Sequence, residues 1–278
     1  MTDILILGGD KRLQYAADIL SKRYTTEICP ADCRRVINNT GKRYKAIVLG
    51  IPCSLDKENI NIPLSVEKFP LEALVEVTDD KGLITGGMIP EKLYGICEKK
   101  KIICEDYYKN ETVILKNAVP SAEGALALGI NMTAETIMGA DILITGYGRI
   151  ASLLAKYLLA MGADVTIVAR REEKRVLAQI NGCRAVDFPE LGNAVRGKSL
   201  IYNTVPYEVF DERAISEISR NAVFIELASK SGADCELCRK YGINHVNGGG
   251  LPAKTAPKTA GEIIAESVIG ILDKHIGV

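Results

Sequence analysis

The sequence predicts an α/β protein with two Rossmann-like parallel-sheet domains joined by a long interdomain helix. Short β-rich runs alternate with helical stretches along the whole chain, as in parallel sheets with crossover helices. The 278 residues fit two domains of the usual size, about 150 residues each. The second half also contains one complete strand, glycine turn, helix and strand, which is the building unit of such folds.

The first domain is expected over residues 1–119, on the substrate side. Its opening strand, "DILILGG", leads into a helix over residues 10–21, because apolar residues recur there on one helical face. These residues are Leu13, Ala16, Ala17 and Leu20. Further strands are expected at residues 46–49, 82–85 and 101–104.

The second domain is expected over residues 120–278, and its first element is the connecting helix at residues 121–138. Ser121 can cap that helix, and Glu123 stands in its first turn. Strands are expected at residues 141–145, 164–169, 200–203 and 223–227. A final helix at residues 259–275 closes the chain.

Composition and charge exclude several classes of function. Lys+Arg and Asp+Glu both total 35, which gives no basic surface for nucleic acid or membrane lipid. The N-terminus has no basic lead, and we expect no segment with the roughly 20 apolar residues of a membrane span. The eight cysteines are scattered, so reduced thiols and a cytoplasmic location are expected.

A glycine motif after the strand at residues 141–145 predicts a dinucleotide site. Gly146, Gly148 and Ala151 form G-x-G-x-x-A at the opening of a helix. The first glycine permits a tight turn, the second lets pyrophosphate approach backbone N–H groups, and the small third residue allows close helix–strand packing. The residues expected to bind the cofactor here are Gly146, Tyr147, Gly148, Arg149 and Ile150.

Two arginines favour NADP as the cofactor. NAD-binding units commonly carry an acid at the end of the second strand, whereas this chain has Arg170 followed by Arg171. An arginine can pair with the 2′-phosphate that a carboxylate would repel. The alternative is that both arginines simply begin the polar helix "REEKRVLAQI".

The segment "YNTVP" follows the strand at residues 200–203 and is expected at the carboxyl edge of the sheet, where ligands collect. Asn203 is a candidate catalytic residue, and Thr204, Val205 and Pro206 are candidate cofactor contacts. The alternative is that Asn203 and Thr204 only cap the following turn.

Six motifs in the same order along nearly the whole chain resemble the A subunit of dipicolinate synthase. They are "GGDKR", "GGMIPE", "PSAEG", "NTVP", "ELASKSGAD" and "GGGLPAKTAPKTAGEII". Ala253 departs from the family's "LPG" pattern, and its methyl group narrows that turn. The resemblance implies an oxidoreductase that converts a dihydrodipicolinate to dipicolinate with NADP, for bacterial endospores. It also implies a second, flavoprotein-like B subunit of dipicolinate synthase and a location in the mother-cell cytoplasm; whether the chain also forms a homo-oligomer stays open.

A dicarboxylate substrate requires local cationic partners, since the chain as a whole is neutral. The predicted substrate-binding residues are Gly9, Arg12, Gly87, Glu123 and Lys254. Lys258 is a second candidate catalytic residue beside Asn203, and we expect Arg12 and Lys258 to clamp the two carboxylates. Each of these charges could equally be a solvated surface group. Asp10 is expected to cap the first helix, and the alternative is that it anchors Arg12.

Other signals and functions carry less weight. Cys235-x-x-Cys238 lacks the further ligands of a structural zinc site, so no metal is expected, and His245 is a weak acid–base candidate. One alternative function is a shikimate-dehydrogenase-like NADP reductase, although no Lys–Asp catalytic pair stands out in the first domain. Another is a non-catalytic dinucleotide-binding protein that regulates a partner.

Overall fold

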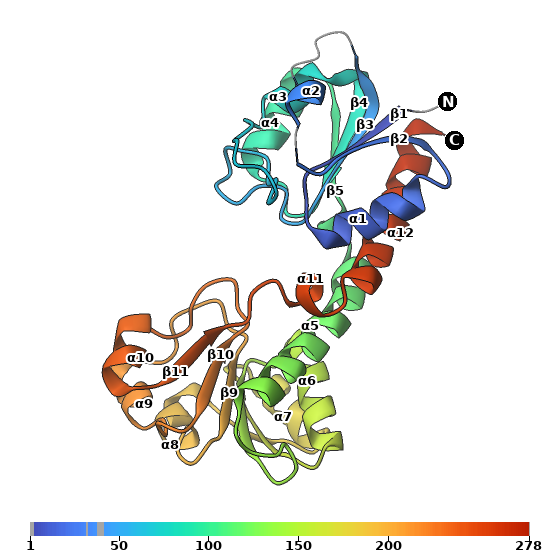
Figure 1. Ribbon diagram of the computed structural model, residues 1–278. Coiled ribbons are helices and arrows are strands. Elements are labelled where there is room, and N and C mark those ends of the chain that lie inside the picture. The colour runs from blue at the N-terminus through green and yellow to red at the C-terminus, as the bar shows by residue number, and fades with distance from the viewer. Residues whose placement is uncertain (1–2, 32, 38–41, 278) are drawn as a thin grey trace. The chain divides into compact units, whose positions relative to one another are not determined.

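The computed structural model describes residues 3–31, 33–37 and 42–277 (Figure 1). The chain divides into two compact units. The first holds the chain up to Asn117 and again from Ala256, and the second is Ala118–Thr255. Each unit contains one parallel sheet with helices, which confirms the predicted α/β class with two Rossmann-like domains.

The first unit has a five-stranded sheet in the order β2-β1-β3-β4-β5, and all its strand pairs are parallel. Its strands are β1 (Asp3–Leu7), β2 (Thr25–Cys29), β3 (Tyr44–Leu49), β4 (Thr78–Gly86) and β5 (Ile103–Asp106). Its helices are α1 (Lys11–Leu20), α2 (Arg34–Ile37), α3 (Ala73–Glu76), α4 (Glu91–Lys99), the 3₁₀ turn η1 (Tyr107–Lys109) and α12 (Pro257–Ile276).

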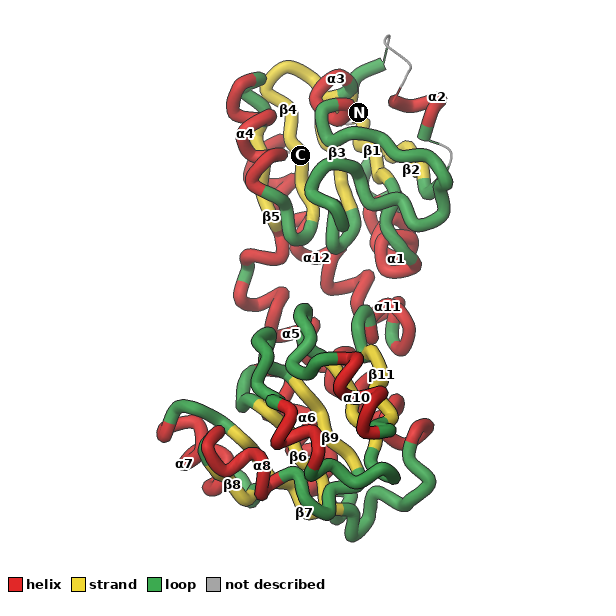
Figure 2. Tube along the Cα trace, turned by 90° about the vertical axis from the view of Figure 1, so that its left-hand side faces the viewer, coloured by secondary structure: helices red, strands yellow, loops and turns green. Residues whose placement is uncertain are grey.

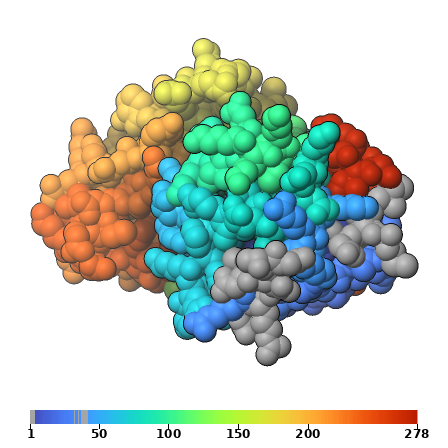
Figure 3. Space-filling view, turned by 90° about the horizontal axis from the view of Figure 1, so that it is seen from above, coloured from blue at the N-terminus to red at the C-terminus, as the bar shows by residue number. Residues whose placement is uncertain are grey.

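Apolar side chains cover both faces of this first sheet. One cluster joins the sheet to α1 and α12 and includes Leu13 and Val268. The other joins it to α3 and α4 and includes Leu74 and Leu93. The sheet is therefore the middle layer of three, and Figure 3 shows the last residues of α12 (red) reaching the surface of this unit.

The second unit has a six-stranded parallel sheet in the order β11-β10-β9-β6-β7-β8 (Figure 2). Its strands are β6 (Asp141–Thr145), β7 (Asp164–Val168), β8 (Arg184–Val186), β9 (Leu200–Asn203), β10 (Val223–Glu226) and β11 (Asn244–Asn247). Its helices are α6 (Arg149–Ala160), α7 (Glu172–Ile180), η2 (Phe188–Glu190), α8 (Leu191–Ala194), α9 (Glu212–Ser216), α10 (Cys235–Tyr241) and α11 (Leu251–Thr255). The four strands predicted for this domain are all present.

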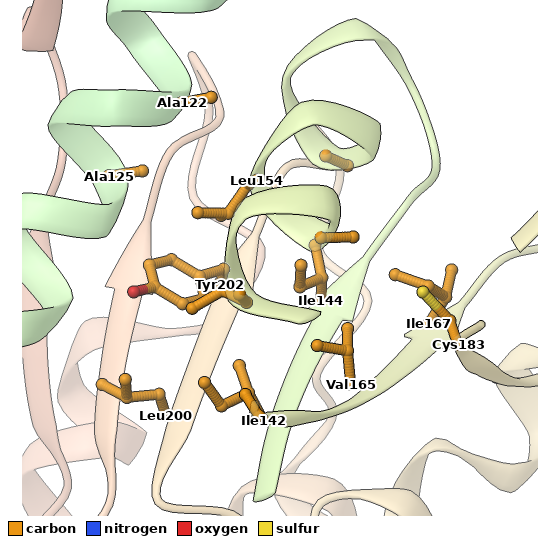
Figure 4. Close-up of a cluster of buried hydrophobic side chains, with 14 of the residues drawn as sticks. Ala122, Ala125, Ile142, Ile144, Leu154, Val165, Ile167, Cys183, Leu200 and Tyr202 are labelled. Carbon is orange, nitrogen blue, oxygen red and sulfur yellow. The ribbon is translucent and has the colours of Figure 1, made fainter. Parts of the chain in front are cut away.

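The core of the second unit also lies on both faces of its sheet. Tyr202 is fully buried between strand residues such as Ile144 and the helix α5 (Glu111–Met132), toward which its hydroxyl points (Figure 4). The opposite face packs against α8, α9 and α10, with Leu191, Ile215 and Cys238 in the contact. Helices on both faces make this unit a doubly wound α/β domain.

The connecting helix α5 begins ten residues earlier than the sequence predicts. Asn110 caps it, since its Oδ1 accepts from the backbone N–H of Thr112 at 2.9 Å, and Pro120 lies inside the helix. The boundary between the two units falls within this helix, between Asn117 and Ala118. By length and composition α5 could cross a membrane, contrary to our expectation, but 44% of the relevant window is buried and a core helix passes the same test.

The last helix differs from its expected domain. We assigned residues 259–275 to the second domain, but α12 packs in the first unit. Its buried residues Ile264, Val268 and Leu272 share one apolar cluster with α1. The helical periodicity predicted the buried face correctly but could not identify the sheet that the face covers.

Candidate functional site

The strand order of the second unit places a ligand crevice beside β6. The chain runs from β6 outward to β7 and β8 on one side, and β9 to β11 extend the sheet on the other side. Ligands of open parallel sheets bind outside the carboxyl ends of the strands where the order reverses in this way. The Gly146 turn follows β6 and the Thr204 loop follows β9, so both predicted cofactor segments lie at this point.

These two segments contact each other. Gly146 has φ +83°, and a Cβ at this position would lie 2.6 Å from Thr204 Oγ1 and 3.3 Å from a methyl group of Val205. Thr204 Oγ1 donates to the carbonyl of Thr145 at 2.6 Å. Gly146 is therefore required by the fold itself, because both the backbone angle and the neighbouring loop exclude a side chain.

Gly148 is in a different situation at the start of α6. Its φ of −94° suits any residue, and a Cβ there would meet no atom within 4 Å. Within the described part of the chain, no side chain caps the first turn of α6. Open space beside uncapped N–H groups at a helix N-terminus fits a bound pyrophosphate, and buried Ala151 allows the close helix–strand contact.

The remaining residues of this turn divide between core and surface. The Tyr147 side chain is buried, and its hydroxyl accepts from Asn181 Nδ2 at 3.2 Å. Burial raises the pKa of Tyr147, so the phenol stays protonated. Because the side chain is buried, only the backbone of Tyr147 can face a cofactor. Arg149 is exposed and Ile150 is half-buried at the edge of the turn.

The arginines after β7 lie on the surface. Arg170 is exposed, and its side chain makes no ion pair with any residue that the structure describes. Arg171 is also exposed, and its Nε lies 3.2 Å from Glu173 Oε1. Arg175, which the sequence did not single out, donates through Nη1 to the carbonyls of Ala169 and Arg170 at 2.8 Å each. The Arg175 guanidinium therefore holds the backbone that carries Arg170.

Asn203 has a structural task that the sequence did not reveal. The residue is fully buried, and its Nδ2 donates to Val205 O at 2.9 Å and to Glu226 Oε1 at 2.7 Å. Its Oδ1 accepts from Val205 N at 3.1 Å and from the Thr145 hydroxyl. Because both its donors and both its lone pairs are engaged, the amide has no group left for chemistry, and the predicted catalytic role of its side chain is not supported.

The predicted substrate residues of the first unit come together around Ile51. A Cβ on Gly87 would lie 2.6 Å from Ile51 Cβ, and a Cβ on Gly9 would lie 3.3 Å from Gly50 Cα. Arg12 also donates to the Ile51 carbonyl. The carboxyl ends of β1, β3 and β4 thus meet in one tightly packed cluster.

Arg12 itself is only 7% exposed and is paired with Asp10. Its Nε and Nη2 donate to the two carboxylate oxygens of Asp10 at 2.9 and 2.7 Å, while Asp10 also caps α1. The charge that we expected to bind a substrate carboxylate is therefore already neutralised within the protein. The sequence left open whether Asp10 anchors Arg12 or caps the helix, and in the structure it does both.

The other three candidates are exposed. Glu123 lies on α5, and Lys254 Nζ donates to the carbonyl of Gly249 at 2.9 Å. Lys258 lies in the first turn of α12, in the first unit, whereas Lys254 belongs to the second. Gly124 follows Glu123 on α5, and a Cβ added to it would lie 2.8 Å from Leu251 Cβ on α11. The motifs "PSAEG" and "GGGLPAKTAPKTAGEII" therefore meet where α5 packs on α11.

Sequence comparisons divide the chain in the same way as the structure. Residues 3–108 match the family of the N-terminal domain of the dipicolinate synthase A subunit. Residues 122–233 match "D-isomer specific 2-hydroxyacid dehydrogenase, NAD binding domain". The second unit is therefore a dinucleotide-binding domain of the dehydrogenase type, without a distinction between NAD and NADP.

Individual relatives confirm the predicted resemblance. The chain is 30% identical over 177 residues to the dipicolinate synthase A subunit of Bacillus subtilis (strain 168), an alignment that covers 63% of this chain and 58% of that relative. The solved dipicolinate synthase A subunit of Bacillus halodurans has 25% identity and a TM-score of 0.86, with 98% of this chain and 97% of that chain covered. D-lactate dehydrogenase of Escherichia coli, at 12% identity and a TM-score of 0.71 over 99% and 97% of the two chains, shares the fold.

Proposed function

We propose, from this resemblance to the dipicolinate synthase A subunit, that the chain is an NADP-dependent oxidoreductase that converts a dihydrodipicolinate to dipicolinate. The observation that carries the proposal is the match of residues 3–108 to the N-terminal domain of that family. A dinucleotide domain alone would fit many dehydrogenases, but the first unit is where such enzymes differ in substrate. The proposed setting is the mother-cell cytoplasm of a spore-forming bacterium, where the flavoprotein-like second subunit is the partner.

The cofactor part of the proposal rests on the Gly146 turn and on Arg170. Open space and uncapped N–H groups at Gly148 suit the pyrophosphate. The exposed guanidinium of Arg170 at the end of β7 suits a 2′-phosphate, and Arg171 adds a second positive charge there. These features favour NADP over NAD.

The chemistry asks little of the protein beyond orientation. Aromatisation of a dihydropyridine ring removes one hydride and one proton; a bound NADP⁺ would supply the hydride acceptor, and the proton passes to a base or to water. The driving force lies in the aromatic product. The chain must therefore bind the two ligands in contact and exclude competing reactions.

For a substrate carboxylate we propose Lys258 of the first unit in place of Arg12. Arg12 is neutralised by Asp10, and it serves together with Gly9 and Gly87 to shape the edge of the first sheet. Lys258 is exposed and makes no ion pair with a residue in the described ranges. As the cation that pairs with a carboxylate, Lys258 cannot also accept the proton, which therefore passes to water or to another base.

The test is NADP reduction by the purified chain, alone and with the flavoprotein-like partner, on dihydrodipicolinate, shikimate and quinate. The proposal predicts reduction with dihydrodipicolinate only. Turnover of shikimate alone would instead identify a shikimate-dehydrogenase-like reductase. NADP binding without turnover, even with that partner present, would identify a non-catalytic regulatory protein.

A further inference from the structure

Glu226 is a buried carboxylate at the carboxyl end of β10, directly beside the cofactor loops. It is 6% exposed, and it ends the apolar run "VFIE". Oε1 accepts from Asn203 Nδ2 at 2.7 Å and from the backbone N–H of Ala228 at 3.1 Å. Oε2 accepts from the N–H of Gly232 at 2.7 Å and lies 3.4 Å from the Ser231 hydroxyl. The three N–H groups are donors, whereas the single proton of the Ser231 hydroxyl goes to the Ala233 carbonyl at 2.7 Å. Together these groups take the place of water around the carboxylate.

Through Asn203 this carboxylate fixes the start of the β9 loop, residues 204–209. Asn203 uses one N–H on Glu226 and the other on the carbonyl of Val205, and its oxygen accepts from the N–H of Val205. The Val205 and Thr145 contacts orient the same amide, and the Glu226 acceptor satisfies the remaining Asn203 N–H in that orientation. The acid thus completes the hydrogen bonds of the Asn203 side chain.

Through Gly232 the same carboxylate fixes the end of the β9 loop. The carbonyl of Gly232 accepts from the N–H groups of Val209 and Phe210, both at 2.9 Å. A Cβ added to Gly232 would lie 2.2 Å from Asn203 Nδ2. The backbone of Gly232, after β10, therefore packs directly against the Asn203 side chain at the end of β9. Both ends of the β9 loop consequently depend on one acid.

The first residues of the β9 loop, Thr204 and Val205, lie against the glycine turn at Gly146. Thr204 Oγ1 and Val205 are the atoms that a side chain on Gly146 would meet. In a dinucleotide domain of this kind, the adenosine half lies toward the second strand, here β7 with Arg170, and the other mononucleotide half lies across the crevice. The β9 and β10 loops are thus on the nicotinamide side.

We infer that Glu226 is a positioning residue that holds the β9 loop in place to receive the nicotinamide half of the cofactor. This inference rests on the proposed function for its ligand, whereas the loop-holding itself follows from the hydrogen bonds. The acid acts through Asn203 and Gly232 and does not itself touch the cofactor.

The test compares Glu226→Gln and Glu226→Asp with the control Glu190→Gln, which neutralises an exposed carboxylate of the same unit. In Glu226→Gln the amide N–H₂ must face at least one of the three N–H donors, while Glu226→Asp keeps a carboxylate on a shorter side chain. The probes are NADPH and 2′-phosphoadenosine diphosphoribose, which is the same cofactor without the nicotinamide ring. Amide hydrogen exchange of residues 203–210 and 228–232 is measured on each variant.

We expect Glu226→Gln to weaken NADPH binding by about tenfold and binding of the fragment by less than about twofold. Exchange should accelerate at residues 203–210 and 228–232 and stay unchanged at residues 146–151. Glu226→Asp should lie between this variant and the parent, and Glu190→Gln should match the parent. If Glu226→Gln does not fold, Glu226→Asp alone tests the inference. It should weaken binding of NADPH more than binding of the fragment, and it should accelerate exchange at residues 203–210 and 228–232.

Equal losses for NADPH and the fragment, or parent-like exchange in both loops, would overturn the inference. If the parent chain binds neither probe, the proposed function fails. Loop exchange then decides the positioning role by itself, so the two failures are distinguishable.

Discussion

The two glycines of the cofactor turn have different physical tasks. Gly146 combines a left-handed backbone with a neighbour at 2.6 Å, so the folded chain requires it. Gly148 has neither constraint, and its lack of a side chain leaves room that only a ligand would use. The sequence motif predicts both positions but cannot separate these tasks, since the separation depends on loops that follow another strand.

Replacement of Gly148 by Ser should therefore separate stability from binding. Serine is a good helix N-cap, so the free energy of unfolding should stay within about 0.5 kcal/mol of the parent. The added side chain occupies the phosphate space, and NADPH affinity should fall by more than about tenfold. Urea unfolding and fluorescence titration measure the two quantities. Gly146→Ser is the control, and it should lose stability; unchanged NADPH affinity in Gly148→Ser would contradict the assignment of the pyrophosphate to this turn.

Arg170 is the residue on which the preference for NADP should depend. In Arg170→Asp the pair with the 2′-phosphate becomes a repulsion, so NADP affinity should fall by more than about tenfold while NAD affinity changes much less. Arg171→Asp should have a smaller effect because its guanidinium already contacts Glu173. Calorimetric titration with both cofactors is the measurement, with Arg213→Asp as the surface control. Equal losses of NADP and NAD would mean that Arg170 only supports the loop.

At the scale of elements, the sequence predicted the positions of the main strands well, but it predicted less well which segments contact each other. The strands β6 and β9 coincide with their predicted bounds because apolar runs between turns define them. The edge strands β2 ("TTEIC") and β8 ("RAV") were not predicted, since they are polar or short. The Asn203–Glu226 contact was also missed. Asn203 and Glu226 are 23 residues apart in sequence, and only strand order brings them together.

The crossing of α12 on α1 depends on one glycine. A Cβ on Gly261 would lie 2.5 Å from the carbonyl oxygen of Arg12 and 2.6 Å from Tyr15 Cβ. Gly261→Ala should destabilise the first unit by about 1–3 kcal/mol because the helices must separate. Gly270→Ala, on the same helix with no atom within 4 Å of the new methyl group, should stabilise it by about 0.5–1 kcal/mol. Denaturant unfolding distinguishes the two, and changes of the same sign would contradict the observed crossing.

The C-terminal end of α12 is attached to β5 through Glu105. Lys274 Nζ and His275 Nε2 lie 2.9 and 2.6 Å from Glu105 Oε2. Burial alone would raise the pKa of Glu105, but hydrogen bonds from Lys274 and His275 outweigh it and hold the pKa below its usual value. The folded state thus favours the ionised acid, so its contribution is present above the unfolded pKa and is lost as pH falls through the folded value.

Glu105→Gln should therefore lower the free energy of unfolding by about 1 kcal/mol at neutral pH. The difference from the parent should shrink as the pH falls through the lowered pKa of Glu105, where the parent carboxylate also becomes protonated. Urea unfolding at several pH values measures it. Glu98→Gln, an exposed acid on α4, should show no such trend; a Glu105→Gln deficit that persists below the lowered pKa of Glu105 would show that charge is not its cause.

At the scale of the whole molecule, the chain joins two α/β units with different likenesses. The unit with residues 3–108 resembles the dipicolinate synthase A subunit, and residues 122–233 resemble a dehydrogenase cofactor domain. The sequence predicted this division because motifs of both kinds stand in one order along the chain. It could not assign α12 or the state of Arg12, since both depend on packing between segments far apart in sequence.

The function proposed for this chain is hydride transfer from a dihydrodipicolinate to NADP. The most direct measurement is the stoichiometry of NADPH and dipicolinate formed under anaerobic conditions, with the flavoprotein-like partner present, where oxygen cannot oxidise the substrate. We predict one NADPH for each dipicolinate, with the rate abolished when the cofactor is omitted. Dipicolinate formed without NADPH, or at the same rate without the chain, would contradict it.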